Sequence, residues 1–94
     1  MLIIAGKLYL APEDCDKWVA SHYDVIQRAR AAPGCVDLYL GADPVEAGRV
    51  NLFEQWESEE HLEAWRATAN PPPKPEIVGG DVQKYQISSS SPPL

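Results

Sequence analysis

The first ten residues alternate between apolar and other side chains, which is the pattern of a half-buried β-strand. The even positions form one apolar face that is interrupted at Gly6: Leu2, Ile4, Leu8 and Leu10. The odd positions form a mixed face: Ile3, Ala5, Lys7 and Tyr9. The alternation therefore predicts a strand over residues 2–10.

From residue 12 onward the spacing of apolar residues changes to that of an α-helix. Pro12 suits the first helical turn, and the acids Glu13 and Asp14 suit its positive end. About one third of the helix circumference is apolar. This stripe carries Cys15, Trp18, Val19, His22, Ile26 and Ala29. Because Pro33-Gly34 is a typical helix stop, we predict one helix over residues 12–31.

Two further strands are predicted on either side of a turn that runs from Asp43-Pro44 to Gly48. Residues 35–41 place one set of side chains on one face: Val36, Leu38 and Leu40. The other face of that strand carries Cys35, Asp37 and Tyr39. Residues 49–57 form the next strand, and one of its faces carries Val50, Leu52, Glu54 and Trp56.

The remaining residues predict one more helix and one more strand. Ser58 is a helix-capping residue, and it precedes a helix with an inward stripe formed by Leu62, Trp65 and Ala69. The proline run that follows Asn70 cannot be helical. Gly79-Gly80 leads into a last strand over residues 81–88, and residues 89–94 are expected to form a flexible tail.

The order β-α-β-β-α-β predicts a ferredoxin-like α+β domain, with a four-stranded antiparallel sheet and two helices on one face. We assign residues 1–88 to this single domain. The uncovered sheet face carries large apolar groups: Ile3, Tyr9, Tyr39, Phe53, Tyr85 and Ile87. Burying each such group is worth about 1.5–3 kcal/mol. We therefore expect a second copy of the chain to cover this face in a homodimer.

The net charge of −6 narrows the classes of partner for this chain of 94 residues. An acidic surface disfavours nucleic acid and anionic membranes, and no apolar run is long enough to span a bilayer. The N-terminal residues lack the basic region of a signal peptide. Cys15 and Cys35 lie at opposite ends of a predicted helix about 30 Å long, so we expect no disulfide between them. These features predict a cytoplasmic protein.

Three short motifs carry a resemblance to a known family. They are Pro33-Gly34-Cys35, Asp43-Pro44 and Glu54-x-Trp56-x-Ser58-x-Glu60. In a chain of this length they resemble the antibiotic biosynthesis monooxygenase family, over residues 1–88. The resemblance implies a dimeric α+β barrel in which each subunit encloses a pocket between helices and sheet. That family includes cofactor-independent oxygenases of aromatic polyketides, haem-degrading enzymes and signal-processing enzymes.

The resemblance carries only part of each catalytic set onto this chain. The strand tryptophan of the polyketide oxygenases matches Trp56, while their asparagine and tyrosine fall at Leu52 and Leu62.

The haem-degrading members match less well. Their helix tryptophan matches Trp65, but their first-strand asparagine falls at Gly6 and their haem-ligating histidine near Pro75. The resemblance therefore argues against haem degradation.

Two residues are candidates for acid–base chemistry. His22 lies at the centre of the apolar stripe, where a neutral imidazole could take a proton from a phenol or an enol. The alternative is a core histidine bonded to a backbone carbonyl. Glu54 shares a strand face with apolar residues and is either a second base or a structural hydrogen-bond acceptor.

The walls of the pocket are expected to be apolar. We expect the following residues to contact a substrate: Trp56, Trp65, Leu52, Leu62 and Ile26. A purely structural role is the alternative for both tryptophans, because they build much of the core of a small domain in any case. Arg66 and Lys74 either guide an anionic substrate to the pocket or are simply solvated charges.

Two functions remain open from the sequence. The first is a cofactor-independent monooxygenase that acts on a small aromatic or hydroquinone-like substrate, with His22 as the base. The second is a non-catalytic small-ligand-binding or accessory homodimer, since fold does not fix function. No metal or other cofactor is expected, because the chain lacks both a zinc-ligand spacing and a glycine-rich phosphate loop.

Overall fold

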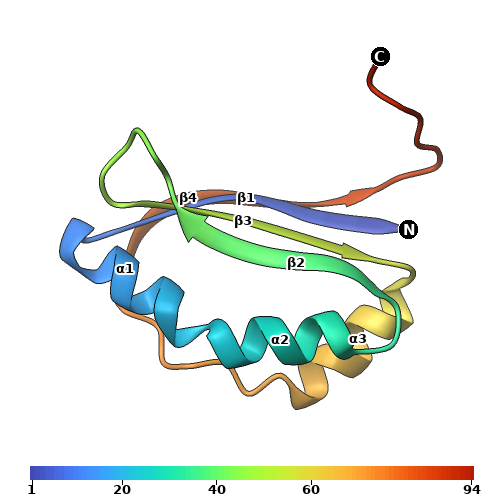
Figure 1. Ribbon diagram of the computed structural model, residues 1–94, viewed down its shortest axis with the longest axis horizontal. Helices are drawn as coiled ribbons and strands as arrows, with labels where there is room; N and C mark the ends of the chain where they lie inside the picture. Colours follow the sequence, from blue (N-terminus) through green and yellow to red (C-terminus); the bar gives the residue numbers. More distant parts are fainter.

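Four strands and three helices follow one another in this protein, and the computed structural model describes all 94 residues (Figure 1). The elements are β1 (Leu2–Leu10), α1 (Pro12–Ser21), α2 (Tyr23–Ala31), β2 (Cys35–Ala42), β3 (Arg49–Trp56), α3 (Glu59–Thr68) and β4 (Ile77–Gln86). The predicted order of strands and helical regions is confirmed, although the first helical region contains two helices.

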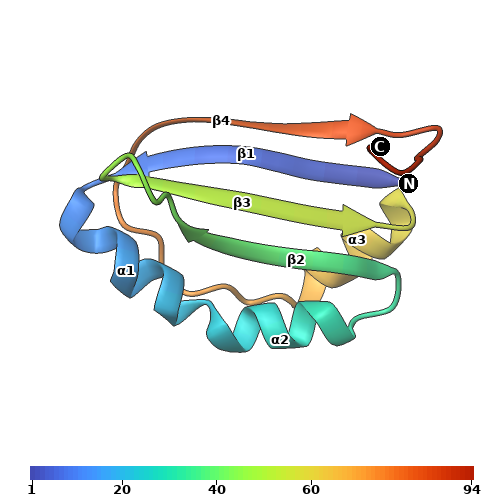
Figure 2. The same cartoon turned by 45° about the horizontal axis from the view of Figure 1, so that its top comes forward.

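The strands form one antiparallel sheet in the order β2-β3-β1-β4. Figure 2 shows the strands side by side, and Figure 1 shows all three helices on the same face of the sheet. Leu2, Ile4 and Leu10 of β1 are buried on that face, as the alternation of the sequence predicts. The ferredoxin-like α+β fold is therefore confirmed.

The predicted helix over residues 12–31 is interrupted at His22, whose φ of −90° and ψ of 1° separate α1 from α2. Two side-chain groups contact the carbonyl oxygen of Trp18: Ser21 Oγ at 2.6 Å and His22 Nδ1 at 2.7 Å. Because these side chains satisfy that carbonyl, the backbone of the next turn is free to leave the helix. The prediction of one continuous helix was wrong for this reason.

The first residues of β2 depart from the predicted alternation. Cys35 pairs with Trp56 and Asp37 pairs with Gln55, so Val36 is an extra residue in a β-bulge. The bulge turns Cys35 toward the core and leaves Val36 51% exposed. The predicted faces of Val36 and Cys35 were therefore wrong, because the alternation assumed an unbroken ladder.

The start of α3 agrees with its predicted cap. Ser58 Oγ accepts a hydrogen bond from the backbone N–H of His61 at 3.2 Å. The imidazole of His61 packs over Gly34, which has a left-handed φ of 81°. A Cβ at this glycine would collide with the imidazole, so the bare backbone lets the start of β2 and the start of α3 pack together.

β4 begins at Ile77, earlier than the predicted residue 81. Ile77 pairs with Leu10, and Gly79 pairs with Tyr9, so the glycines lie inside the strand rather than before it. After β4 ends at Gln86, the N–H of Ile87 still donates to the carbonyl oxygen of Met1 at 3.0 Å, and the chain then leaves the sheet (Figure 1). None of the helices has the length and apolar character needed to cross a membrane.

Two apolar clusters fill the space between the sheet and the helices. The larger cluster contains Trp56, Leu62 and Trp65, and the smaller one contains Trp18 and Val50. Both cysteines are free, and each packs with a different cluster. The core is therefore divided, and a cavity borders residues of both parts.

Candidate functional site

A cavity of about 320 Å³ lies between the helical layer and the sheet. Nine of its 14 lining residues are hydrophobic, which is typical of a small-ligand site. The sheet contributes Leu8, Leu38, Tyr39, Leu40, Leu52 and Glu54, the helices contribute Trp18, His22, Val25, Trp65 and Arg66, and the segment after α3 contributes Ala69, Pro71 and Lys74.

His22 is a buried polar residue in the wall of this cavity, and only 8% of its surface is exposed. Its Nδ1 lies 2.7 Å from the carbonyl oxygen of Trp18. Because a carbonyl oxygen can only accept, Nδ1 must carry a proton, and in the neutral ring Nε2 keeps a free lone pair. Nε2 makes no hydrogen bond within the chain. The backbone therefore holds the ring in a tautomer whose basic nitrogen remains available.

Trp18 also borders the cavity, although it was not among the expected pocket residues. Its ring meets that of His22 edge to face, with centroids 4.7 Å apart and planes at 80°. Its side chain is buried, and its Nε1 has no hydrogen-bond acceptor. The spacing of Trp18 and His22 on one helical stripe was the signal that could have identified it, since residues four apart share a helix face.

Glu54 reaches the cavity from β3. Its Oε1 accepts a hydrogen bond of 3.0 Å from Nε1 of Trp56, two residues along the same strand. Its other oxygen, Oε2, makes no hydrogen bond within the chain. The carboxylate is therefore fixed through one oxygen and retains acceptor capacity on the other.

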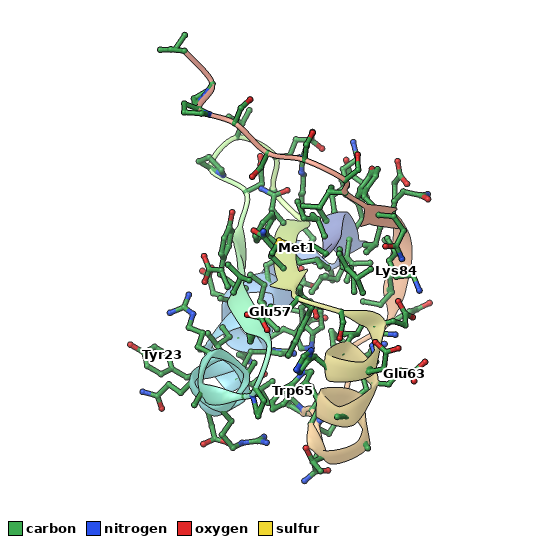
Figure 3. The ribbon with its side chains drawn as sticks, turned by 90° about the vertical axis from the view of Figure 1, so that its right-hand side faces the viewer. Met1, Tyr23, Glu57, Glu63, Trp65 and Lys84 are labelled. Carbon is green, nitrogen blue, oxygen red and sulfur yellow. The ribbon has the colours of Figure 1, made fainter.

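Trp56 and Trp65 stack, with centroids 6.2 Å apart and planes at 25°. In Figure 3, Trp65 extends from α3 toward α2, whereas Glu63 of the same helix points away from the body. The guanidinium of Arg28 lies 5.6 Å from the centre of the Trp65 ring, and its Nη2 donates to the carbonyl oxygen of Ala69 at 2.8 Å. Arg28 thus links α2 to the end of α3 and supports this part of the wall.

The expected site residues divide into two groups by position. Those that border the cavity are His22, Glu54, Leu52 and Trp65. Trp56 and Leu62 differ from the expectation, because both are fully buried in the core behind the wall. Ile26 borders a separate hollow of about 300 Å³ between α2 and β2. Its expected position relied on a continuous helix, and the break at His22 interrupts that helical phase.

Two cations border the cavity from segments that are distant in sequence. Arg66 lies on α3, and Lys74 lies in the proline run between α3 and β4. Pro71 of the same run also borders the cavity. The proline run has no helix or strand periodicity, so the sequence could not predict that it borders the cavity. Its high proline content was the only sign that its conformation is special.

The residues do not fit a haem site. Gly6, at the position of the asparagine of the haem-degrading enzymes, has a φ of 152°, and a Cβ there would collide with the backbone carbonyl oxygen of Asp81 on β4. Pro75 stands near the position of their iron ligand and offers no ligating side chain. No three His, Cys, Asp or Glu side chains gather as potential metal ligands.

Cys35 is poorly suited to covalent chemistry. Burial raises the pKa of its thiol, and the carboxylates of Asp37 and Glu54 raise that pKa further, while Arg30 opposes them. A raised pKa keeps the thiol protonated at neutral pH, and a thiol is a much weaker nucleophile than a thiolate. Cys35 is therefore a packing residue.

Solved structures of other proteins share this fold. A candidate antibiotic biosynthesis monooxygenase from Deinococcus radiodurans is similar with a TM-score of 0.70 and 14% identity, over 100% of this chain and 99% of that chain. A conserved protein from Methanosarcina mazei Go1 has a TM-score of 0.71 and 14% identity, over 93% and 92% of the two chains. A Bacteroides thetaiotaomicron protein of unknown function, described as a possible oxidoreductase, has a TM-score of 0.69 and 10% identity, over 92% and 96%.

The family assignment comes from the sequence itself, because structural likeness at such low identity shows only the fold. No curated protein matches the sequence. The sequence profile described as antibiotic biosynthesis monooxygenase matches residues 1–70, which is most of the chain. The protein therefore belongs to the antibiotic biosynthesis monooxygenase family.

Proposed function

We propose that the protein is a cofactor-independent monooxygenase that oxidises a small aromatic or hydroquinone-like substrate in the cavity between sheet and helices. One observation carries the proposal. His22 is a buried histidine at the wall of an apolar cavity, with one ring nitrogen bonded to the backbone and the other unused. The family to which the chain belongs is described by the same class of activity.

In the proposed mechanism, Nε2 of His22 removes the proton of a phenolic hydroxyl. The Nδ1–H bond to the carbonyl oxygen of Trp18 keeps the ring oriented and stabilises the positive charge that the ring gains. The resulting phenolate is electron-rich and can pass electrons directly to dioxygen. The nine hydrophobic residues of the cavity wall would limit the contact of this anion with water.

The overall reaction balances with dioxygen as the only oxidant. For a hydroquinone, one oxygen atom of dioxygen is inserted into a ring C–H bond as a new hydroxyl group. The other oxygen atom leaves as water, together with the hydrogens of the two original hydroxyl groups. The ring loses four electrons, dioxygen gains them, and the products are a hydroxyquinone and water.

Glu54 is proposed to orient the substrate. Its Oε1 is held by Trp56, and its unused Oε2 can accept a hydrogen bond from a second hydroxyl group of the substrate. Leu52 and Trp65 would contact the apolar ring of the substrate. Trp56 stacks behind Trp65 and would keep that indole in place.

The test measures oxygen uptake with a panel of hydroquinones and anthrones, and it follows isotopically labelled dioxygen into the product. We expect His22→Gln to lower kcat by at least about 100-fold, since general bases commonly contribute 10²–10⁴. His61→Gln is the matched control, because His61 contacts Ser58 outside this cavity and should leave turnover unchanged. Equal turnover by wild type and His22→Gln would remove His22 from the mechanism.

A second function is favoured by one specific observation. Leu52 and Leu62 stand where the polyketide oxygenases keep an asparagine and a tyrosine, so two polar groups of that catalytic set are absent. This favours a non-catalytic small-ligand-binding or accessory homodimer. Tight binding of aromatic ligands without oxygen uptake across the panel would support this second function over the first.

We also propose that the protein is a homodimer whose subunits meet through the open face of the sheet. Tyr39 and Phe53 stack on that face with centroids 5.3 Å apart, and Tyr39 and Tyr85 are 45% and 50% exposed. Such apolar surface is commonly buried against a partner. The free thiols of Cys15 and Cys35 support a reducing, cytoplasmic location.

A further inference from the structure

Two cations that border the cavity have no anionic partner within the chain, as is also true of Lys7 and Lys17. Most arginines of the protein are engaged in ion pairs, and so is Lys84: Arg28, Arg30 and Arg49 each contact an aspartate or glutamate. Arg66 and Lys74 border the cavity and take part in none of these pairs. Glu54 is the only carboxylate in the cavity wall, and one of its oxygens is already bonded. The wall of the cavity therefore carries more positive than negative charge, in a protein whose net charge is −6.

Lys74 also borders an adjoining surface hollow of about 240 Å³, together with Lys17, Trp18 and Asp14. Lys17 takes part in no ion pair either, so this end of the site carries two cations and one carboxylate. A negatively charged oxygen at this end would be attracted by the Lys74 ammonium. Trp18 Nε1 is itself buried without an acceptor, so the indole serves as wall and not as a donor to the ligand.

The proline run limits the freedom of Lys74. Pro71, Pro72, Pro73 and Pro75 surround it, and consecutive prolines form a stiff, extended chain. Because little backbone entropy remains to be lost on binding, a lysine on such a segment is better suited to hold an anion than one on a flexible loop.

The volume of the cavity limits the size of the ligand. An apolar cavity of roughly 150 Å³ accommodates benzene. The cavity here is about 320 Å³, so it accommodates about two fused rings.

From these observations we propose that the natural ligand is a one- or two-ring phenol or hydroquinone that carries a carboxylate, with the ring in the cavity and the carboxylate at Lys74 and Arg66. This rests on the proposed function for the oxidised ring and adds the acid group, which that function does not require.

The test compares two ligands that differ only in charge, a hydroxynaphthoate and the corresponding hydroxynaphthamide. Their affinities are measured by calorimetry without oxygen, so that turnover does not contribute. We expect the carboxylate to bind about tenfold more tightly than the amide at low salt, through two partly exposed ion pairs. High salt should reduce this preference, because salt screens exposed charges.

Substitutions of the two cations test whether they cause the preference for the carboxylate over the amide. The double variant Lys74→Gln with Arg66→Gln should remove most of this preference for the carboxylate and leave the affinity for the amide unchanged. Lys7→Gln is the control, because Lys7 is also outside any ion pair but borders a different surface hollow, beside Arg49 and Asp81. Both cations are exposed, so folding of the double variant is expected to be intact.

Equal affinities for the two ligands, a preference that survives the double variant, or no binding of either ligand would each overturn the inference. A carboxylate preference without any oxygen uptake would support the inference and count against the monooxygenase. Oxidation of both compounds with equal KM would leave the monooxygenase standing and overturn the inference.

Discussion

At the scale of single residues, the polar groups of the cavity wall share one arrangement. His22 uses Nδ1 to bind the Trp18 carbonyl oxygen and leaves Nε2 unused. Glu54 uses Oε1 to accept from Trp56 and leaves Oε2 unused. A group held by one atom is pre-oriented for a ligand at the other, which lowers the entropy cost of positioning that ligand.

The bond between Trp56 and Glu54 can be tested by Trp56→Phe. This change keeps an aromatic ring in the core but removes the donor to Glu54 Oε1. Leaving a partly buried carboxylate oxygen without its partner, together with the smaller ring, should lower the free energy of unfolding by about 1–3 kcal/mol. Denaturant unfolding gives the value. Trp65→Phe is the control because no hydrogen bond of its indole is lost, and a loss as large as that of Trp56→Phe would show that packing alone is responsible.

At the scale of elements, the hydrophobic periodicity of the sequence predicted the regular strands and helices, but it did not predict the bulge and the helix break that interrupt them. The alternation in β1 and the cap at Ser58 were sufficient, because each depends on residues adjacent in sequence. The bulge at Val36 depends on the register with β3, which no single strand encodes. The break at His22 depends on Ser21 and His22 both binding one carbonyl, and a helical stripe looks the same with or without that break.

Helix capping predicts opposite changes in the free energy of unfolding for one substitution at the start of α3 and one at the start of α1. Ser58 caps α3 through its Oγ, whereas Ala11 at the start of α1 offers no side-chain cap. We expect Ser58→Ala to lower the free energy of unfolding by about 0.5–2 kcal/mol, and Ala11→Ser to raise it by up to about 1 kcal/mol. Denaturant unfolding of both variants against wild type measures each change. The same sign for both changes would contradict the argument from capping.

The turn between β2 and β3 is held by one carboxylate. Asp43 Oδ2 accepts from the backbone N–H groups of Val45 at 3.0 Å and Glu46 at 2.8 Å, and Oδ1 accepts from Asn51 at 2.8 Å. These bonds, chiefly that from the N–H of Glu46, favour the ionised form and lower the pKa of Asp43 from 3.8 to about 2. The ionised carboxylate therefore stabilises the folded protein above about pH 4, and this contribution is lost as the pH falls toward about 2.

The pH dependence is tested with Asp43→Asn. The difference between its unfolding temperature and that of wild type should be largest above about pH 5 and should shrink toward about pH 2, where the wild-type carboxyl is becoming protonated. Asp16→Asn makes the same change in charge at an exposed residue without a hydrogen bond, so its difference should stay small throughout. A gap between wild type and Asp43→Asn that does not vary with pH would count against this role of Asp43.

At the scale of the whole molecule, the sequence predicted a pocket between sheet and helices but only part of its lining. Leu52, Glu54 and Trp65 could be placed from their strand face or helix stripe. Lys74 could not, because its position depends on the path of a proline run that returns from α3 to β4. A segment without helix or strand periodicity gives no indication of which side chains face the cavity, and here the proline run is such a segment and contributes Lys74 to the site.

The homodimer is the last prediction and belongs to this scale. All helices cover one face of the sheet (Figure 1). Tyr39 and Phe53 pair across β2 and β3 and stack, at positions that alternate with Leu38 and Glu54 of the cavity side, so we place their rings toward the open face. A charge placed there would have to be desolvated in a sheet-to-sheet interface. We therefore expect Phe53→Lys to convert the protein to a monomer in sedimentation experiments and to lower its unfolding temperature. Tyr23→Lys is the control, because Tyr23 is 73% exposed on the outer side of α2 (Figure 3) and should leave the dimer intact. A wild-type protein that sediments as a monomer at high concentration would rule out the dimer, and the open face would then have to remain in contact with water.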